Sequence, residues 1–272
     1  MLLAALLHAG WNLLVRSGGD RALDALLVAV SASAVSAVAV AFLPAPARAS
    51  WPYVAASAAI HAVYFGLLAE AYREGDFGPS YTIMRGTAPL LVAAAAAAGA
   101  GPDPLSPRTA LGALTIAAGV LGMALLARRP GALPRRALAF ALANAGVIAA
   151  YTLVDGAGVR RSGHAVAYTG WVFVLDAVPL VALAAATRGR AVLAHARRSW
   201  RRGLAGGLFT LGAYALVLWA MTRAPVAGVA ALRETSVVFG TALATWRLRE
   251  PFGAGRIAAA AVVALGVALL GR

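Results

Sequence analysis

The chain has 272 residues, of which 61% are hydrophobic and only 12% charged, and its formal net charge is +14. About 25% of the residues of an ordinary soluble domain are charged, so a soluble fold of this size would lack the polar surface to cover its core. Cysteine is absent, which excludes disulfides and iron–sulfur clusters. All 24 basic residues are arginine, so the chain has no lysine for a Schiff-base cofactor or a Walker A motif. We therefore expect no cofactor.

Long apolar segments follow one another along the whole chain, each close to the length of about 20 residues that crosses a bilayer. Clusters of Gly, Pro and charged residues separate them, such as RSGGDR at 16–21 and GPDPLSPR at 101–108. The pattern predicts an all-α integral membrane protein with ten transmembrane helices, at about 1–15, 23–43, 53–72, 78–99, 109–127, 137–155, 165–187, 203–222, 226–246 and 252–271. The segment RGRAVLAHARRSWRR at 188–202 carries six arginines and can form a short interfacial helix.

The two halves of the chain resemble each other. PRTALGALTIAAGVLGMALLAR at 107–128 aligns with PFGAGRIAAAAVVALGVALLGR at 251–272, and HAG at 8–10 aligns with NAG at 144–146. We therefore expect two five-helix repeats, 1–128 and 137–272, joined by a basic linker at 129–136. Because five is an odd number, the second repeat is inverted relative to the first, as in many secondary transporters.

Arginine is unevenly distributed over the predicted connections. One side of the membrane receives 16 arginines and the other side, termini included, receives 6. The positive-inside rule then makes the arginine-rich side cytoplasmic and puts both termini outside. In a membrane protein such loops indicate contact with anionic lipid rather than with nucleic acid, which we do not expect as a partner.

A small set of polar side chains falls inside the predicted helices, where each needs a partner or a wet cavity. We expect ten residues to line a substrate cavity: His8, Trp11, Asn12, Tyr64, Tyr81, Arg85, Asn144, Tyr151, Arg233 and Glu234. Three residues are candidates for proton coupling, namely Glu234, Asp176 and His61. For each there is a structural alternative, in which the side chain only ties helices together.

Two local patterns make the cavity prediction more specific. His8, Trp11 and Asn12 are spaced i, i+3 and i+4, so they share one face of a helix. That face and the face of Asn144 and Tyr151 would form opposite walls. In the ungapped alignment of the two repeats Arg85 corresponds to Glu234, so we expect these two to pair or to share a ligand.

Several motifs, in their order and spacing, resemble the EamA-type members of the drug/metabolite transporter superfamily. They are LLHAGWN at 6–12, AYREGDFGPSYTIMRGTAPLL at 71–91 and VAALRETSVVFGTALATWRLREPFGAGR at 229–256, together with the five-plus-five repeat. The resemblance implies a ten-helix carrier, usually an exporter of amino acids, other metabolites or drugs. It also implies termini in the cytoplasm, opposite to the orientation that the arginines indicate.

We expect a secondary-active transporter in the plasma or inner membrane, since the sequence has no nucleotide-binding motif. Its mixed charges favour export of a small zwitterion, such as an amino acid, or of an organic anion. The alternatives are an exporter of drugs or cationic compounds, a channel, and a scaffold that transports nothing. An enzyme is not expected, because the sequence has no cluster of acids, histidines or nucleophiles, and no metal site is expected either. The chain is expected to be a monomer or a homodimer.

Overall fold

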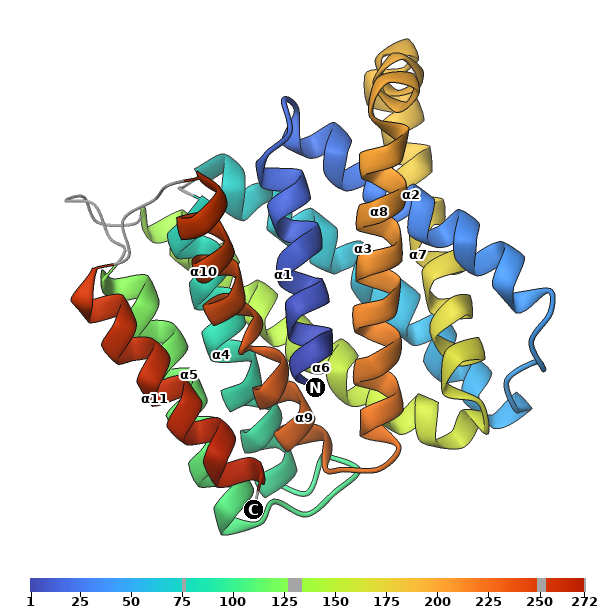
Figure 1. The fold of residues 1–272 in the computed structure, drawn as a ribbon. Coiled ribbons are helices and arrows are strands. Elements are labelled where there is room, and N and C mark those ends of the chain that lie inside the picture. The colour runs from blue at the N-terminus through green and yellow to red at the C-terminus, as the bar shows by residue number, and fades with distance from the viewer. Residues whose placement is uncertain (75–76, 127–133, 249–252, 272) are drawn as a thin grey trace.

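The apolar segments form helices that end at the Gly, Pro and charge clusters between them. This computed structural model describes residues 1–74, 77–126, 134–248 and 253–271. Within them lie α1 (Leu2–Arg16), α2 (Arg21–Val40), the 3-10 turn η1 (Arg48–Ser50), α3 (Trp51–Glu74), α4 (Phe77–Ala97), α5 (Pro107–Leu126), α6 (Arg135–Ser162), α7 (Ala165–Arg188), α8 (Arg190–Met221), α9 (Val226–Arg233), α10 (Ser236–Leu248) and α11 (Ala254–Gly271) (Figure 1). No strand occurs in these ranges, so the all-α prediction is confirmed.

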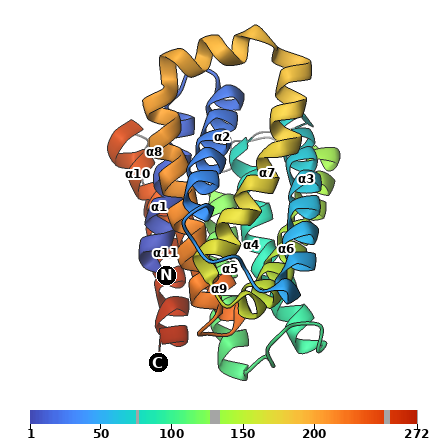
Figure 2. The same cartoon turned by 90° about the vertical axis from the view of Figure 1, so that its right-hand side faces the viewer.

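Three helix boundaries differ from the prediction. The predicted ninth helix is two helices, because α9 ends at Arg233 and α10 begins at Ser236. The sixth helix, α6, extends to Ser162. The arginine-rich segment is not a separate interfacial helix but the first part of α8, since its Ala, Leu and Arg residues all favour helix. Figure 2 shows these first turns of α8 crossing one end of the bundle before the helix turns down along α1 and α2.

Among the described residues, seven helical stretches are long and apolar enough to cross a membrane. They lie in α2, α3, α6, α7, α8, the pair α9–α10, and α11, whereas α1 and the apolar part of α5 are shorter. The stretches are spread along the whole chain, which supports a multi-pass membrane protein. Of the predicted basic linker 129–136, residues 129–133 lie outside the described residues, and α6 begins within it at Arg135.

The helices pack in a bundle whose closest pairs come from different halves of the chain. α5 packs along α11, α3 along α6, α1 along α8, and α2 along both α7 and α8. Glycines bring α5 and α11 together. A methyl group added at Gly119 would lie 2.8 Å from the Ala259 carbonyl oxygen. Such close approach of backbones is the usual way in which helices associate where hydrocarbon surrounds them.

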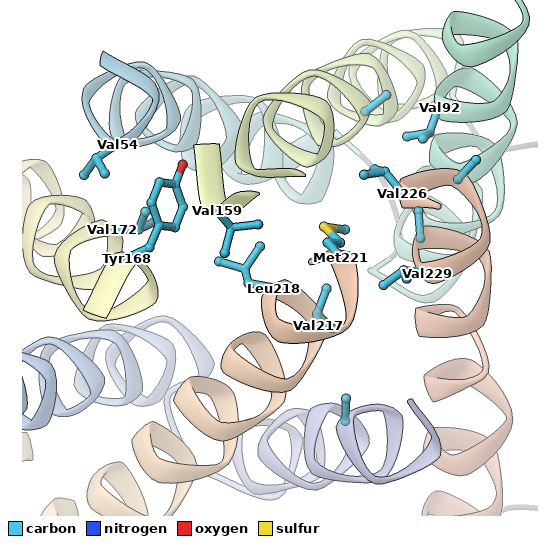
Figure 3. Close-up of a cluster of buried hydrophobic side chains, with 14 residues drawn as sticks. Val54, Val92, Val159, Tyr168, Val172, Val217, Leu218, Met221, Val226 and Val229 are labelled. Atoms are coloured by element: carbon cyan, nitrogen blue, oxygen red, sulfur yellow. The ribbon is translucent and has the colours of Figure 1, made fainter. Parts of the chain in front are cut away.

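The two ends of the bundle differ in character. The α1–α2 connection and the first turns of α8, which carry its arginines, lie at the same end of the bundle (Figure 1). Toward the other end, where α6, α8 and α9 meet, buried apolar side chains fill the space between the helices (Figure 3). We call this cluster the apolar plug, with Val54, Val159, Tyr168, Val172, Val217, Leu218, Met221, Val226 and Val229 as its main members.

Candidate functional site

A cavity of about 240 Å³ lies among the helices, next to the apolar plug, with which it shares Val217. Residues of α1, α2, α3, α4, α6, α7, α8 and α9 line it, so both halves of the chain contribute. Its chemically distinctive lining residues are His8, Trp11, His61, Tyr64, Arg85, Tyr151, Phe173, Asp176, Thr210, Tyr214 and Arg233. Six of the ten residues predicted to bind substrate are among them, as are two of the three candidates for proton coupling.

Two arginines form the positive pole of the cavity. Arg85 of α4 and Arg233, the last residue of α9, line the cavity and are each only 5% exposed. The fully buried Glu234 lies behind them, with its Oε2 atom 2.7 Å from Arg85 Nε and its Oε1 atom 3.5 Å from Arg233 Nε. The structure thus confirms the predicted pairing of Arg85 and Glu234. Two guanidinium groups against one carboxylate leave a single positive charge in excess.

The break between α9 and α10 lets Glu234 reach both arginines. Glu234 N–H donates to the Ala231 carbonyl at 3.0 Å and Thr235 N–H to that of Leu232 at 3.2 Å, so the chain turns by three-residue steps here. Ser236, which starts α10, accepts a hydrogen bond from Arg85 at 3.4 Å. A discontinuous helix that presents charged groups near the middle of a bundle is a recurring binding element in membrane carriers.

The face shared by His8, Trp11 and Asn12 is bonded largely within α1. Trp11 Nε1–H donates to His8 Nδ1 at 3.4 Å, and His8 Nε2 lies 3.2 Å from the Tyr81 hydroxyl. Since an indole nitrogen only donates, His8 is the neutral tautomer with its proton on Nε2. His8 and Trp11 face the cavity, whereas Asn12 donates to the His8 carbonyl oxygen of its own helix at 2.8 Å.

Four of the predicted residues do not reach the cavity surface: Asn12, Tyr81, Asn144 and Glu234. Asn144 is completely buried, and its amide donates to the Met84 sulfur at 3.2 Å because α4 packs over that part of α6. The expected wall opposite α1 is therefore made by Tyr151 without Asn144. Tyr81 contacts the cavity residue His8, and Glu234 contacts the two arginines of the lining.

An acidic pole occupies another part of the lining. Asp176 of α7 has its Oδ2 atom 3.5 Å from Nδ1 of His61, a residue of α3. The ring of His61 stacks on Tyr151 at 4.3 Å between centroids, and the Arg233 guanidinium lies 5.8 Å from the centroid of the same tyrosine. Tyr151 thus contacts a residue of each pole. The arginines line one region of the cavity and Asp176 lines another, so the cavity is polarised.

A second buried carboxylate supports the acidic pole from outside the lining. Asp155 accepts hydrogen bonds from the hydroxyls of Tyr168, at 2.9 Å, and of Tyr214. Asp155 lies one turn after Tyr151 on α6, whereas Tyr214 and Thr210 of α8 were not among the residues predicted from the sequence. Thr210 and Tyr214 are four residues apart on an apolar helix, so they lie on the same face, one turn apart. This spacing is the signal that identifies them.

Ion pairs and charged hydrogen bonds connect different segments of the bundle on either side of the cavity. Near the plug, Asp103 binds Arg160 through two hydrogen bonds of 2.7 and 2.9 Å and accepts the Val226 N–H that begins α9. Partial burial raises the pKa of Asp103, but the hydrogen bonds from Arg160 and Val226 and the charge of Arg160 lower the pKa more, so that it lies below its ordinary value. At the arginine-rich end, buried Asp24 of α2 accepts from His195 of α8 at 2.9 Å.

Comparisons with known proteins give a family and a fold. Residues 135–272 match the model of the EamA-like transporter family. A solved structure described only as the crystal structure of a protein is similar to this chain with a TM-score of 0.75 and 19% sequence identity, covering 98% of this chain and 93% of the other. That likeness establishes a shared fold alone. No curated protein matches the sequence.

Proposed function

Because the chain belongs to the EamA-like transporter family, we propose that this membrane transporter is a secondary-active carrier that exports a small zwitterion, such as an amino acid, or a small organic anion. The observation on which the proposal depends is the cavity at the meeting point of the two halves, with Arg85 and Arg233 in its lining and only Glu234 to balance them. In this setting the excess guanidinium charge is available to a carboxylate, which Arg binds with two parallel hydrogen bonds.

The size of the cavity favours a small substrate over a drug. Sites for drug-sized ligands have volumes of about 300–1,000 Å³, whereas this cavity has about 240 Å³. A cationic compound would also meet the two arginines. The aromatic rings of Trp11, Tyr64 and Tyr151 can pack on an apolar side chain of the substrate.

Two inverted five-helix repeats would give this carrier its mechanism. If α1–α5 correspond to α6–α11, with α9 and α10 together as one helix, a two-fold axis exchanges the pair α3–α6 with the pair α8–α1. It also puts α2 beside α7 and α5 beside α11. All four pairs are in contact, which supports the proposed symmetry. Alternating access would then be a movement of one repeat against the other about this axis.

In this proposal the structure is a state in which the cavity is separated from one end of the bundle. The apolar plug and the Asp103–Arg160 pair close the end toward which α9 begins. The cavity lining continues in the other direction to Ala25, in the first turns of α2. With the arginine-rich end in the cytoplasm, as the positive-inside rule requires, the carrier would receive its substrate from the cytoplasm, as an exporter in the plasma or inner membrane must.

The absence of cysteine makes the orientation directly measurable. Ser199→Cys lies among the arginines of α8, and Ser106→Cys lies before α5 at the opposite end. A membrane-impermeant thiol reagent added to whole cells should label Ser106→Cys and not Ser199→Cys. The reverse labelling would support the orientation that the family resemblance implies. Anionic lipid at the exposed arginines and Trp200 of α8 is expected in the cytoplasmic leaflet.

Counterflow in proteoliposomes tests the transport proposal. Vesicles loaded with a mixture of the common amino acids or of small carboxylates should accumulate labelled compound of the same class, and the rate should saturate. Arg233→Gln should abolish this flux, whereas Arg108→Gln, at the exposed start of α5, should leave it unchanged. Flux that does not saturate would support a channel, and absence of flux for every compound would support a scaffold. Chromatography of the detergent-solubilised protein then distinguishes a monomer from a homodimer.

A further inference from the structure

Asp176 is a buried carboxyl whose hydrogen bonds are incomplete. Its side chain lines the cavity and is 14% exposed, yet its Oδ1 atom is buried, and no donor of the described residues reaches it. The second oxygen, Oδ2, lies 3.5 Å from His61 Nδ1, which is longer than a normal hydrogen bond. An ionised carboxylate in such surroundings is costly unless a cation or several donors reach it.

The hydrogen of His61 is engaged elsewhere. Nδ1 lies 3.0 Å from the Ser57 carbonyl oxygen of the preceding turn, and a carbonyl only accepts, so Nδ1 carries the proton. That N–H points to Ser57 at 3.0 Å and is 0.5 Å farther from Asp176, at 3.5 Å. A small approach of α7 to α3 would transfer the hydrogen bond from Ser57 to Asp176. The Ser57 hydroxyl oxygen also lies 3.2 Å from Nδ1. His61 is thus a donor whose alternative acceptors are the oxygens of Ser57 in its own helix and Asp176 in the other half of the chain.

The other two acidic groups at the cavity have closer partners than Asp176, namely two hydroxyl donors for Asp155 and two arginines for Glu234, although neither oxygen of Glu234 accepts a hydrogen bond from the described residues. Asp155 receives the hydroxyls of Tyr168 and Tyr214. Glu234 has Arg85 and Arg233 within 3.5 Å of its oxygens. Among the acids in and behind the described lining, Asp176 is the one in contact with the cavity that lacks both an arginine and a full set of donors.

The groups around Asp176 come from every helix that packs on α7. α3 contributes His61 and Tyr64, α6 contributes Asp155 and Tyr151, α8 contributes Tyr214, and α2 contributes only apolar lining residues. Arg233 lies 5.8 Å from the centroid of the Tyr151 ring and pairs with Glu234. One carboxylate and no unpaired arginine therefore face Asp176 among these groups.

We propose that Asp176, positioned by His61, is the proton-binding site that couples transport, and that Glu234 is not. The inference rests on the proposed function for its role in transport. A proton from the cavity water binds the carboxylate and converts it to a neutral acid, which is stable with His61 bonded to Ser57. When the proton returns to water on the other side, the carboxylate draws the His61 N–H to Oδ2. Because α3 and α7 belong to different halves, protonation changes how closely the halves pack.

Infrared difference spectroscopy of the reconstituted protein tests the site without any substrate. Between two pH values the wild-type protein should show the carbonyl stretch of one titrating carboxylic acid. Asp176→Asn should remove this band, Asp176→Glu should restore it at a shifted position, and Glu234→Gln should leave it in place. Loss of the band in Glu234→Gln, or its persistence in Asp176→Asn, would overturn the proposal. Asp176→Glu keeps the test valid if the asparagine variant does not fold.

Proton movement in proteoliposomes tests the coupling separately. Vesicles that contain a pH-sensitive dye receive a mixture of the common amino acids, and internal pH is followed. The wild-type protein should move protons, and Asp176→Asn should fall to the level of protein-free vesicles. Equal proton flux in both would refute the coupling. A band that depends on Asp176 together with no proton flux in the wild type would support the proton site and contradict its coupling to transport, whereas absence of counterflow in the wild type would contradict the proposed function instead.

Discussion

Arg85 of α4 lies with its Nε atom 2.7 Å from the Oε2 atom of Glu234, at the break between α9 and α10, and thereby joins the two halves of the chain beside the cavity. The two side chains are 6% and 1% exposed. In the interior of a membrane protein a single buried ion is costly. Arg85 in the cavity lining therefore needs Glu234 as its partner.

We expect a charge swap to separate pairing from other roles of these residues. Removing one member of a buried ion pair costs about 3–5 kcal/mol. Glu234→Ala should destabilise more than Arg85→Ala, because it leaves Arg85 and Arg233 without an acid. The double variant Arg85→Glu/Glu234→Arg keeps the net charge and should regain part of the thermal stability and of the transport. If the swap is no more stable than Arg85→Ala, direct pairing is not what stabilises this region.

The Asp103–Arg160 pair should make stability depend on acid pH. Because the folded protein lowers the pKa of Asp103 below its ordinary value of 3.8, the carboxylate stabilises the fold fully above that value, and the contribution is lost as pH falls through the lowered pKa. Near neutral pH, Asp103→Asn should therefore have a free energy of unfolding about 2 kcal/mol lower than that of the wild type. It should accordingly unfold at a lower temperature. Under strong acid the two should converge.

Glu70→Gln is the matched control for this pH series. Glu70 pairs with Arg73 on the surface of α3, where the two side chains are 36% and 70% exposed. Exposed pairs of this kind contribute little to stability, so Glu70→Gln should follow the wild type at every pH. A difference between Asp103→Asn and wild type that is the same at all pH values would show that the carboxylate charge is not responsible.

Close packing of α5 on α11 predicts opposite results for glycines of one helix. A methyl group at Gly119 would lie 2.8 Å from the Ala259 carbonyl oxygen and 2.9 Å from the Val263 nitrogen, both backbone atoms that cannot move alone. Gly119→Ala should destabilise by about 1–3 kcal/mol. At Gly122 the nearest atom is the Ala259 methyl at 3.8 Å, so Gly122→Ala should be neutral or slightly stabilising in thermal unfolding. Equal effects of both changes would contradict this packing.

The tie between α2 and α8 predicts another matched pair of glycine changes. A methyl group at Gly18 would overlap the carboxylate of Asp24, which accepts a hydrogen bond from His195, whereas nothing lies within 4 Å of one at Gly19. Gly18→Ala should displace Asp24 and lower the unfolding temperature, and Gly19→Ala should not. In the background of Asp24→Ala the effect of Gly18→Ala should disappear. An unchanged effect there would show that the glycine acts through something else.

The sequence by itself determined the class of protein and the approximate limits of its helices. Hydrophobic segments of bilayer length and their Gly and Pro breakers are local properties, so α2, α5 and α7 lie close to where they were expected. The cost of polar groups in hydrocarbon also identified Arg85, Tyr151, Arg233 and Asp176 before any contact was known. The Arg85–Glu234 pair followed from the alignment of the halves.

Only the tertiary structure decided which of these groups meet and which face the cavity. Asn144 has the polarity of a cavity residue, but α4 covers it and Met84 takes its hydrogen bond. The break at Glu234 was not visible in a continuous helical pattern, because it is set by the partners of that carboxylate in α4 and α9. Likewise the contact of His61 with Asp176 joins helices more than a hundred residues apart. Helical periodicity gives the face of each residue, but the rotation and neighbours of each helix depend on how all the helices pack together.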